Sequence, residues 1–185
     1  MPGKVCVGVG VLVVDDSSSD GVRVLLGRRK GSHGSGTWAL PGGWLELNEA
    51  FIACALRELE EETGLTEADI APVGRVVMPV VANNVMDSGT VHSVTVFVRL
   101  SLATSAAASK VRVMEPNKCH EWRWCSPIEA PPQPMFPPLE HLMTSDYWRD
   151  AFEPKKKYSV QGHQVAAVAG VAGFLLGALA VRARS

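Results

Sequence analysis

The chain has 185 residues, of which 46% are apolar and 20% charged, and its formal net charge is −1. This length accommodates one domain of common size plus an appendage, and the apolar fraction is sufficient for a hydrophobic core. A nearly neutral balance excludes the basic footprint of a general nucleic-acid-binding protein, so we expect no nucleic-acid polymer as a partner.

The four cysteines lie at positions 6, 54, 119 and 125, inside segments that we predict to be strands and a helix. None has C-x-x-C spacing, which argues against a zinc site. Residues 1–4 lead directly into an apolar run, so we expect no N-terminal signal peptide. Reduced thiols in a cytoplasmic catalytic domain are the simplest interpretation.

The first predicted elements form a hairpin. Residues 5–14 are rich in valine and predict a buried strand, in which Gly8 and Gly10 mark close approaches of other groups. Residues 15–21 form a polar turn, and residues 22–26 predict the second strand.

A basic, glycine-rich loop follows at residues 27–36, with the sequence GRRKGSHGSG. Flexible cationic side chains next to a cluster of carboxylates suit a polyphosphate. Arg28, Lys30 and His33 are therefore candidate substrate-binding residues. A solvated hairpin loop is the alternative.

Residues 43–65 contain the predicted central helix. Asn48 is the expected N-cap, and Gly64 suits the left-handed position just after the helix end. One stripe at helical spacing is apolar and should be buried; it comprises Phe51, Ile52, Ala55, Leu56 and Leu59.

The acidic residues of this helix carry the chemical information. Glu58, Glu61 and Glu62 are three and four residues apart and project from one side, whereas Glu60 points away. These like charges repel one another, and a bound hard cation would offset the repulsion, because Mg²⁺ takes carboxylate oxygens, waters and phosphates as ligands. Arg57 is placed to hold these carboxylates. An ordinary solvated acidic face is the alternative.

The spacing of the whole segment carries a family resemblance. Gly43, five residues, Glu49, seven residues and then Arg57-Glu58-Leu59-Glu60-Glu61-Glu62-Thr63-Gly64-Leu65 match every fixed position of the Nudix box. The chain thus resembles a Nudix hydrolase, an enzyme that cleaves a nucleoside diphosphate linked to another moiety. The resemblance implies an α/β Nudix fold, an α/β/α sandwich with a mixed sheet and the Nudix loop-helix.

The resemblance also implies roles. It makes Glu58, Glu61, Glu62 and the Gly43 carbonyl ligands of Mg²⁺, with Mn²⁺ as an alternative metal. It makes Glu61, Glu62 and Arg57 catalytic, and which glutamate serves as the base varies within the family. Glu115 is a more distant candidate base, for which a surface glutamate is an equal alternative.

Further strands are predicted at residues 73–81, 91–102 and 120–125, and helices at 139–144 and 146–152. Strands around a central helix, followed by terminal helices, indicate an α/β layered fold with a mixed sheet. Asn84 and His92 lie in or beside the predicted loop between the first two of these strands, and are candidate substrate contacts. Trp122 and Trp124 share a strand face and suit a core or a dimer interface better than base stacking.

A closer likeness rests on several short segments outside the box: residues 8–11 (GVGV), 26–32 (LGRRKGS), 40–46 (LPGGWLE), 115–116 (EP), 122–124 (WRW) and 135–139 (MFPPL). They are similar to nucleotide-pool Nudix hydrolases, typified by plant cytosolic enzymes and the human thiopurine-nucleotide diphosphatase. This likeness implies hydrolysis of oxidised or modified nucleoside triphosphates to monophosphate and pyrophosphate, and a homodimer.

The same likeness leaves the substrate open. Phe136 and Leu139 are candidate substrate contacts, but Pro137 stands where relatives have the tryptophan that lines the base pocket. One plant branch acts on prenyl diphosphates, which is the first alternative. A nucleotide-binding module without catalysis is the second, although the complete glutamate set argues against it.

The C-terminal part differs in composition. We divide the chain into a Nudix domain (1–153), a basic and polar linker (154–164), a membrane anchor (165–181) and a basic tail (182–185). Residues 165–181 are 17 consecutive apolar or small residues, just long enough for a transmembrane helix. Flanking basic residues favour a tail anchor in an organelle outer membrane. The alternative is a segment too rich in alanine and glycine to insert.

Overall fold

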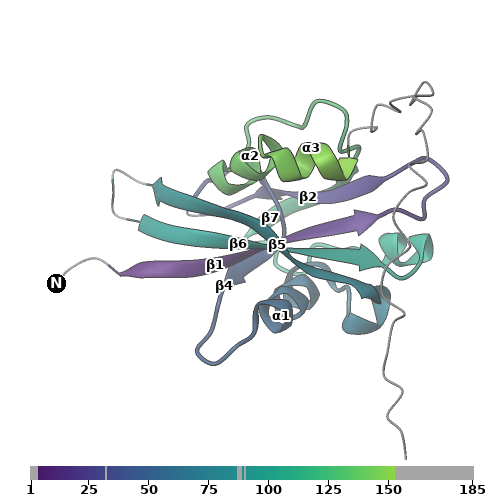
Figure 1. The fold of residues 1–185 in the computed structure, drawn as a ribbon, viewed down its shortest axis with the longest axis horizontal. Coiled ribbons are helices and arrows are strands. Elements are labelled where there is room, and N and C mark those ends of the chain that lie inside the picture. The colour runs from purple at the N-terminus through teal and green to yellow at the C-terminus, as the bar shows by residue number, and fades with distance from the viewer. Residues whose placement is uncertain (1–3, 32, 87–88, 90, 153–185) are drawn as a thin grey trace, which may run out of the picture. The chain divides into compact units, whose positions relative to one another are not determined.

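A mixed seven-stranded sheet forms the centre of the computed structural model, which describes residues 4–31, 33–86, 89 and 91–152 (Figure 1). Its strands are β1 (Val5–Asp15), β2 (Arg23–Arg29), β3 (Trp38–Ala39), β4 (Gly42–Trp44), β5 (Ile70–Met86), β6 (Val91–Leu102) and β7 (Cys119–Cys125). The helices are α1 (Phe51–Thr63), α2 (Pro137–Met143) and α3 (Asp146–Phe152), with 3₁₀ turns η1 (Glu67–Asp69) and η3 (Ser105–Lys110). The predicted α/β fold with a mixed sheet is confirmed.

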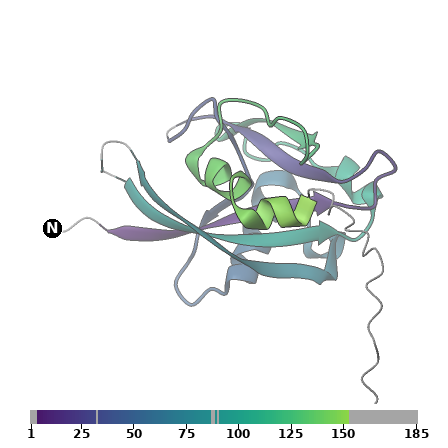
Figure 2. The same cartoon turned by 45° about the horizontal axis from the view of Figure 1, so that its top comes forward.

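The strand order is β3-β2-β1-β6-β5, with β4 paired to β1 and β7 paired to β2. β1 runs parallel to β6 and antiparallel to β2 and β4. The helices divide between the two faces of this sheet, with α1 on one face and α2 and α3 on the other (Figures 1 and 2).

From Gly8 onward β1 is buried on both faces, because its side chains alternate between two hydrophobic layers, whereas Val5 and Val7 at its start are exposed. Val9, Val11 and Val13 pack in the layer that contains α1. Leu12 and Val14 pack in the layer that contains α2 and α3. This explains why the strand reads as a continuous apolar run rather than an alternating one.

β1 and β2 pair only where their hairpin closes, at Val14 with Val24 and at Asp15 with Arg23. Beyond this point β1 pairs with β4, whereas β2 pairs with β3 and β7. The two strands therefore diverge, and β3 and β4 enter between them.

Helix α1 confirms one predicted boundary and corrects the other. Gly64 has φ of 76° in the left-handed region, as expected. The N-cap is Ala50 rather than Asn48, and its side chain makes no capping bond. Asn48 instead adopts a left-handed turn with φ of 65°, and Glu49 turns back to accept the Glu46 backbone N–H.

β5 is longer than predicted. It spans Ile70–Met86, with irregular register between Ile70 and Arg75 and between Val77 and Val81. Asn83 and Asn84 therefore lie within a strand, not in a loop. Asn83 is exposed on this edge strand, whereas Asn84 is buried and tolerated because its amide hydrogen-bonds to Ala82 and Thr95.

All of these elements belong to one compact unit, Met1–Pro154. Within the described part of the chain, no helix is long and apolar enough to cross a membrane. The predicted anchor at residues 165–181 lies outside the described residues.

Asp15 supports the closed end of the hairpin. Its side chain is fully buried, accepts a hydrogen bond from Arg23 Nη2 at 2.5 Å, and also accepts hydrogen bonds from the Ser17 N–H and O–H.

Asp15→Asn should lower the free energy of unfolding by roughly 1–3 kcal/mol, because it leaves the Arg23 guanidinium without its charged partner. Urea denaturation measures this effect. Asp20→Asn in the exposed turn is the control, expected within about 0.5 kcal/mol of the parent protein; an equal effect of the two variants would contradict the assignment.

Candidate active site

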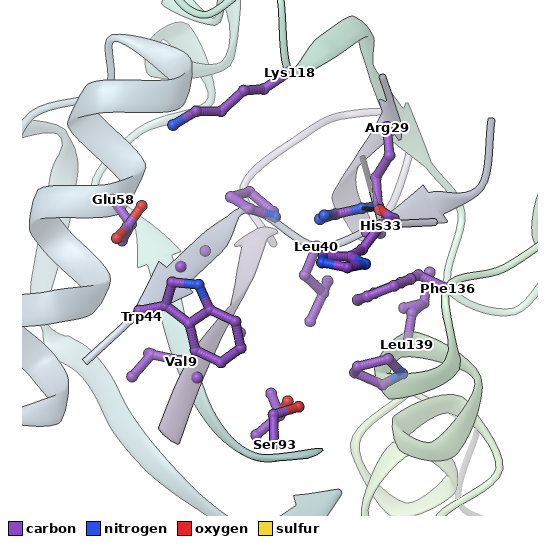
Figure 3. Close-up of a pocket in the computed structure, with 18 of the residues that line it drawn as sticks. Val9, Arg29, His33, Leu40, Trp44, Glu58, Ser93, Lys118, Phe136 and Leu139 are labelled. Atoms are coloured by element: carbon purple, nitrogen blue, oxygen red, sulfur yellow. Dashed lines mark hydrogen bonds between the residues drawn. The ribbon is translucent and has the colours of Figure 1, made fainter. Parts of the chain in front are cut away.

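A cavity of about 510 Å³ lies where β1 and β2 diverge, and residues of β1, β2, β3, β4, α1, β6 and α2 line it. In Figure 3, Glu58 and Lys118 lie on one side of it, and Phe136 and Leu139 lie on the other. Trp44 and Ser93 line the edge between them. The first side is charged, whereas the second combines the apolar Phe136 and Leu139 with Arg29 and His33, which lie beside Phe136.

Glu62 is the buried carboxylate of the charged side. Its Oε2 accepts the Gly42 backbone N–H at 3.0 Å, which ties α1 to β4. Burial raises the pKa of Glu62 to about 7, and repulsion from Glu58 and Glu115 adds to the rise, while the Gly42 N–H and Arg29 oppose it. A carboxyl group is difficult to ionise here without a nearby cation.

Glu58 lies directly over the backbone of Gly43. A Cβ atom at residue 43 would be 2.2 Å from Glu58 Oε1, so only glycine permits this approach. Arg57 Nη1 donates to the same oxygen at 2.7 Å. Glu58, Glu62 and Gly43 all line the cavity.

Arg57 fastens the loop before α1 to the helix. Its Nε and Nη2 donate to the two oxygens of Glu49 at 2.8 and 3.0 Å, and Nη2 also donates to the Trp44 carbonyl. The Arg57 hydrogen bonds lower the pKa of Glu49 to about 2. Arg57 is therefore placed to position Glu58 and Trp44, and it does not itself line the cavity.

Cys54 belongs to the same network. Its thiol donates to the Trp44 carbonyl at 3.6 Å and accepts from Arg57 Nη2 at 3.5 Å. Burial and the neighbouring Glu49 raise the pKa of Cys54 to about 12.

The structure brings together two of the three glutamates predicted to bind metal. The Glu61 side chain is 54% exposed, and its Oε2 lies 3.5 Å from Arg57 Nη1. Glu61 does not line the cavity. Among the described residues, no three His, Cys, Asp or Glu side chains converge as a ready-made metal site. Glu58, Glu62 and Gly43 nevertheless offer oxygen donors, and Mg²⁺ commonly takes only one or two carboxylates and completes its shell with waters and phosphates. The donor set fits that ion.

The cations at the cavity differ in part from those selected in the sequence. Lys30 lines it as expected, together with Arg29 and Lys118, which the sequence argument missed. Arg28 is exposed and does not line the cavity. The register between β2 and β7 shifts between Arg28 and Arg29, and this irregularity is not visible in the sequence.

Arg29 is held in place by two contacts. Its Nε donates to the His33 carbonyl at 3.0 Å, and its guanidinium lies 4.4 Å from the centre of the Phe136 ring. Burial lowers the pKa of Arg29, and attraction to Glu62 opposes that shift. His33 also lines the cavity.

Lys118 and Glu115 form an ion pair of 2.7 Å at the rim. The Lys30 backbone N–H donates to the Lys118 carbonyl at 2.7 Å, which holds the segment after β2 next to the segment before β7. Glu115 raises the pKa of Glu62 and so lies within its electrostatic reach, although it does not line the cavity.

Asn84 and His92 do not line the cavity. His92 Nε2 is 2.8 Å from Asn83 Oδ1, and strand alternation directs His92 to the face opposite Ser93. Asn84 is buried and bonds to Thr95. Ser93 and Thr95 are the β6 residues with hydroxyl groups that line the cavity, beside Val91 and Phe97, and the sequence argument missed them.

Phe136 and Leu139 line the cavity as expected, whereas Pro137 is exposed and does not. Phe136 therefore supplies an aromatic surface despite the proline at the next position. Trp122 and Trp124 pack against the core, as expected, and donate to the carbonyls of Glu62 and Ala108.

Comparison with known proteins gives a consistent picture. The family model described as "NUDIX domain" matches residues 4–145. The RNA pyrophosphohydrolase of Halorhodospira halophila is 44% identical over 66 residues, which cover 36% of this chain and 33% of that protein. The m7GpppN-mRNA hydrolase NUDT17 of Xenopus laevis is 44% identical over 67 residues, which cover 35% of this chain and 21% of that protein. The chain thus spans about a third, or less, of these curated relatives.

Solved structures match over more of the chain. The MutT NUDIX hydrolase from Burkholderia pseudomallei has a TM-score of 0.59 and 25% identity, covering 77% of this chain and 99% of that one. The solution structure of the E. coli ORF135 protein has a TM-score of 0.55 and 23% identity, covering 83% and 96%. The second likeness concerns the fold alone.

The raised pKa of Glu62 predicts a pH-dependent cost to folding. Below about pH 4.5 a glutamate is protonated in both states, whereas above about pH 7 the folded state must hold an unfavourable buried charge. Stability in the presence of a chelator should therefore fall as pH rises from 4.5 to 7. Glu62→Gln should remove this fall and stabilise the protein by about 1–3 kcal/mol at pH 8.

Thermal unfolding of both proteins at pH 5 and pH 8 measures the difference. Glu60→Gln is the matched control, because Glu60 is exposed on the other side of the helix. If the stability of Glu62→Gln fell between pH 5 and pH 8 as much as that of the parent protein, the assignment of a buried charge to Glu62 would be contradicted.

Proposed function

The chain belongs to the NUDIX domain family, and on that basis we propose that it is a Mg²⁺-dependent pyrophosphohydrolase. Its substrates would be nucleoside triphosphates, oxidised or otherwise modified ones included. Its products would be the nucleoside monophosphate and pyrophosphate.

One observation carries this proposal: a single cavity brings two carboxylates and three cations together with an aromatic and apolar surface. Its volume of about 510 Å³ lies within the range of small-molecule sites. A nucleotide has the same division, with a polyanionic end and a flat heterocyclic end.

Arg29, Lys30 and Lys118 would bind the phosphate oxygens. Guanidinium and ammonium donors form charge-assisted hydrogen bonds with such oxygens, and Arg29 has its Nε already committed to His33, so its terminal nitrogens are the ones left for a ligand. Phosphoryl transfer depends mainly on positioning and on stabilising negative charge, so these cations would do most of the protein's part.

Glu58, Glu62 and the Gly43 carbonyl would hold the Mg²⁺ ion, with Glu61 able to join after a rotamer change. When bound, Mg²⁺ supplies neutralisation of phosphate charge and a more acidic water. The role of Arg57 is to keep Glu58 over Gly43, and that of the Gly42 N–H is to keep Glu62 turned inward.

Two groups are candidates for the base that takes a proton from water. Glu62 is buried beside Glu58, and Glu115 lies at the rim with its charge balanced by Lys118. A catalytic base must reach the attacking water directly or through one other water. Glu62 is the better placed, because it lines the cavity and Glu115 does not.

The aromatic side favours a nucleotide over a prenyl diphosphate. Phe136 and Trp44 would face a flat ring, and the Ser93 and Thr95 hydroxyls supply polar partners that a hydrocarbon chain cannot use. Burying unpaired hydroxyls against a prenyl group would cost binding energy. RNA is a further candidate substrate, since one relative is named an RNA pyrophosphohydrolase and another an m7GpppN-mRNA hydrolase.

A substrate panel tests the proposal. We expect Mg²⁺-dependent release of pyrophosphate from nucleoside triphosphates, with little release of orthophosphate, and Glu62→Gln should lower turnover at least 100-fold. Geranyl diphosphate and 5′-triphosphorylated RNA complete the panel. Preference for either of these would replace the proposed substrate, and nucleotide binding without turnover would indicate a binding module.

Arg28 and Arg29 provide a matched pair of variants within one strand. Arg29→Gln should lower kcat/KM about 10- to 100-fold, because a charge-assisted contact to phosphate is lost. Arg28→Gln should stay within about twofold of the parent enzyme, because Arg28 is exposed outside the cavity. Steady-state kinetics with one nucleotide measure both, and a larger loss in Arg28→Gln would contradict the assignment.

A further inference from the structure

We propose that Thr95 selects substrates by the chemistry of their ring. Its hydroxyl group, oriented by Asn84, donates a hydrogen bond to a carbonyl-type oxygen and disfavours an amino group at the same ring position. This inference rests on the proposed function, since it takes the ligand to be a nucleotide, and it adds which nucleotides the cavity prefers.

Asn84 fixes the direction of the Thr95 hydroxyl. Asn84 Nδ2 donates to the Ala82 backbone carbonyl at 3.1 Å and to Thr95 Oγ1 at 3.1 Å. A backbone carbonyl only accepts, so the amide must present its NH₂ group rather than its oxygen to Ala82. The same NH₂ group then faces Thr95, whose oxygen has to act as the acceptor.

The Thr95 proton must therefore point elsewhere. Among the residues described, this O–H donates no hydrogen bond; the only bond that Thr95 Oγ1 makes there is the one it accepts from Asn84. Thr95 lines the cavity and is 8% exposed. A ligand in the cavity can supply the missing acceptor.

The β1 residue next to this hydroxyl is Gly8, which has no side chain to cover it. A Cβ atom at Gly8 would lie 3.7 Å from Thr95 Oγ1 and 3.7 Å from the Trp44 ring. At Gly10 the equivalent position is already occupied, because a Cβ atom there would lie 3.0 Å from the Phe97 ring and 3.4 Å from Thr95 Cγ2. The approach to the Thr95 hydroxyl is therefore over Gly8, where a ring can lie edge-on with Trp44 beside it.

Ser93 does not make the same distinction. It also lines the cavity, but no described residue orients its hydroxyl group, which can rotate to donate or to accept. Any preference for oxygen over an amino group should therefore depend on Thr95. A ring amino group facing Thr95 would place two donors against each other, and an unpaired buried donor is costly.

Two pairs of nucleotides test this contact. Inosine and adenosine triphosphates differ along one edge of the ring, where oxygen beside a ring N–H replaces an amino group beside a bare ring nitrogen, and uridine and cytidine triphosphates differ in the same way. We expect the wild-type enzyme to prefer the oxygen-bearing member of at least one pair by about tenfold in kcat/KM. Thr95→Val should bring this ratio to about one by lowering kcat/KM for that member alone.

Matched variants separate the hydroxyl from packing. Thr95→Ser keeps the hydroxyl and should keep the preference. Ser93→Ala removes the neighbouring hydroxyl and should leave the ratio within about twofold. Asn84→Leu, which keeps Thr95 but removes its orienting donor, should lower the ratio; an effect on folding alone would lower kcat/KM for both members equally and leave the ratio unchanged.

Binding measurements distinguish this inference from the proposed reaction. Calorimetry with triphosphate analogues that carry a methylene group in place of the scissile oxygen reports preference without turnover. A Thr95-dependent preference in binding without hydrolysis of the natural nucleotides would uphold the inference and defeat the proposed function. Hydrolysis with the same ratio in wild type and Thr95→Val, or no binding of any analogue, would overturn the inference.

Discussion

The hydrogen bond from the Gly42 backbone N–H to Glu62 is the contact on which the site depends. It holds a carboxylate in a place where burial and two other glutamates oppose its charge. It also requires β4 to lie very close to β1, because a Cβ atom at residue 42 would be 2.0 Å from the Val9 carbonyl oxygen. Glycine with φ of 142° is thus the residue that permits helix and sheet to meet here.

The geometry of the sheet explains why this meeting point is also a cavity. β1 and β2 pair at only two positions, and the buried Asp15 holds that end together. Farther along, the short strands β3 and β4 fill the divergence and carry the backbone of Gly42 and Gly43 to the carboxylates of α1. The apolar side is completed by α2, which brings Phe136 and Leu139 from a distant part of the chain. Charge and aromatic surface therefore come from different elements that meet only in the folded protein.

Local patterns in the sequence were sufficient to predict several helices and strands, but not which side chains line the cavity. The strand at β1 and the left-handed Gly64 follow from short-range rules, and both were predicted. The apolar stripe of α1 was predicted only in part: Ala55 and Leu59 are buried, whereas Phe51 is exposed. The spacing of the glutamates placed Glu58 and Glu62 on one side of α1, but it could not show that Glu61 remains in solvent. Arg29 was missed in favour of Arg28, its neighbour in β2, because consecutive residues of a strand point to opposite faces and the sequence does not show which face borders the cavity. Asn84 was expected to touch substrate, yet it lies behind Thr95, and only the pairing of β5 with β6 reveals that arrangement.

Cys54 gives the network around Arg57 a property that matters under oxidative stress. Oxidants and alkylating agents attack the thiolate, and a pKa of about 12 leaves only a minute fraction of this sulfur ionised at neutral pH. The thiol is also enclosed between the Trp44 carbonyl and Arg57. A sulfur atom in the first turn of α1, next to the arginine that holds Glu58, is thereby protected from oxidation. The contacts that fix Glu58 over Gly43 would accordingly persist under oxidising conditions.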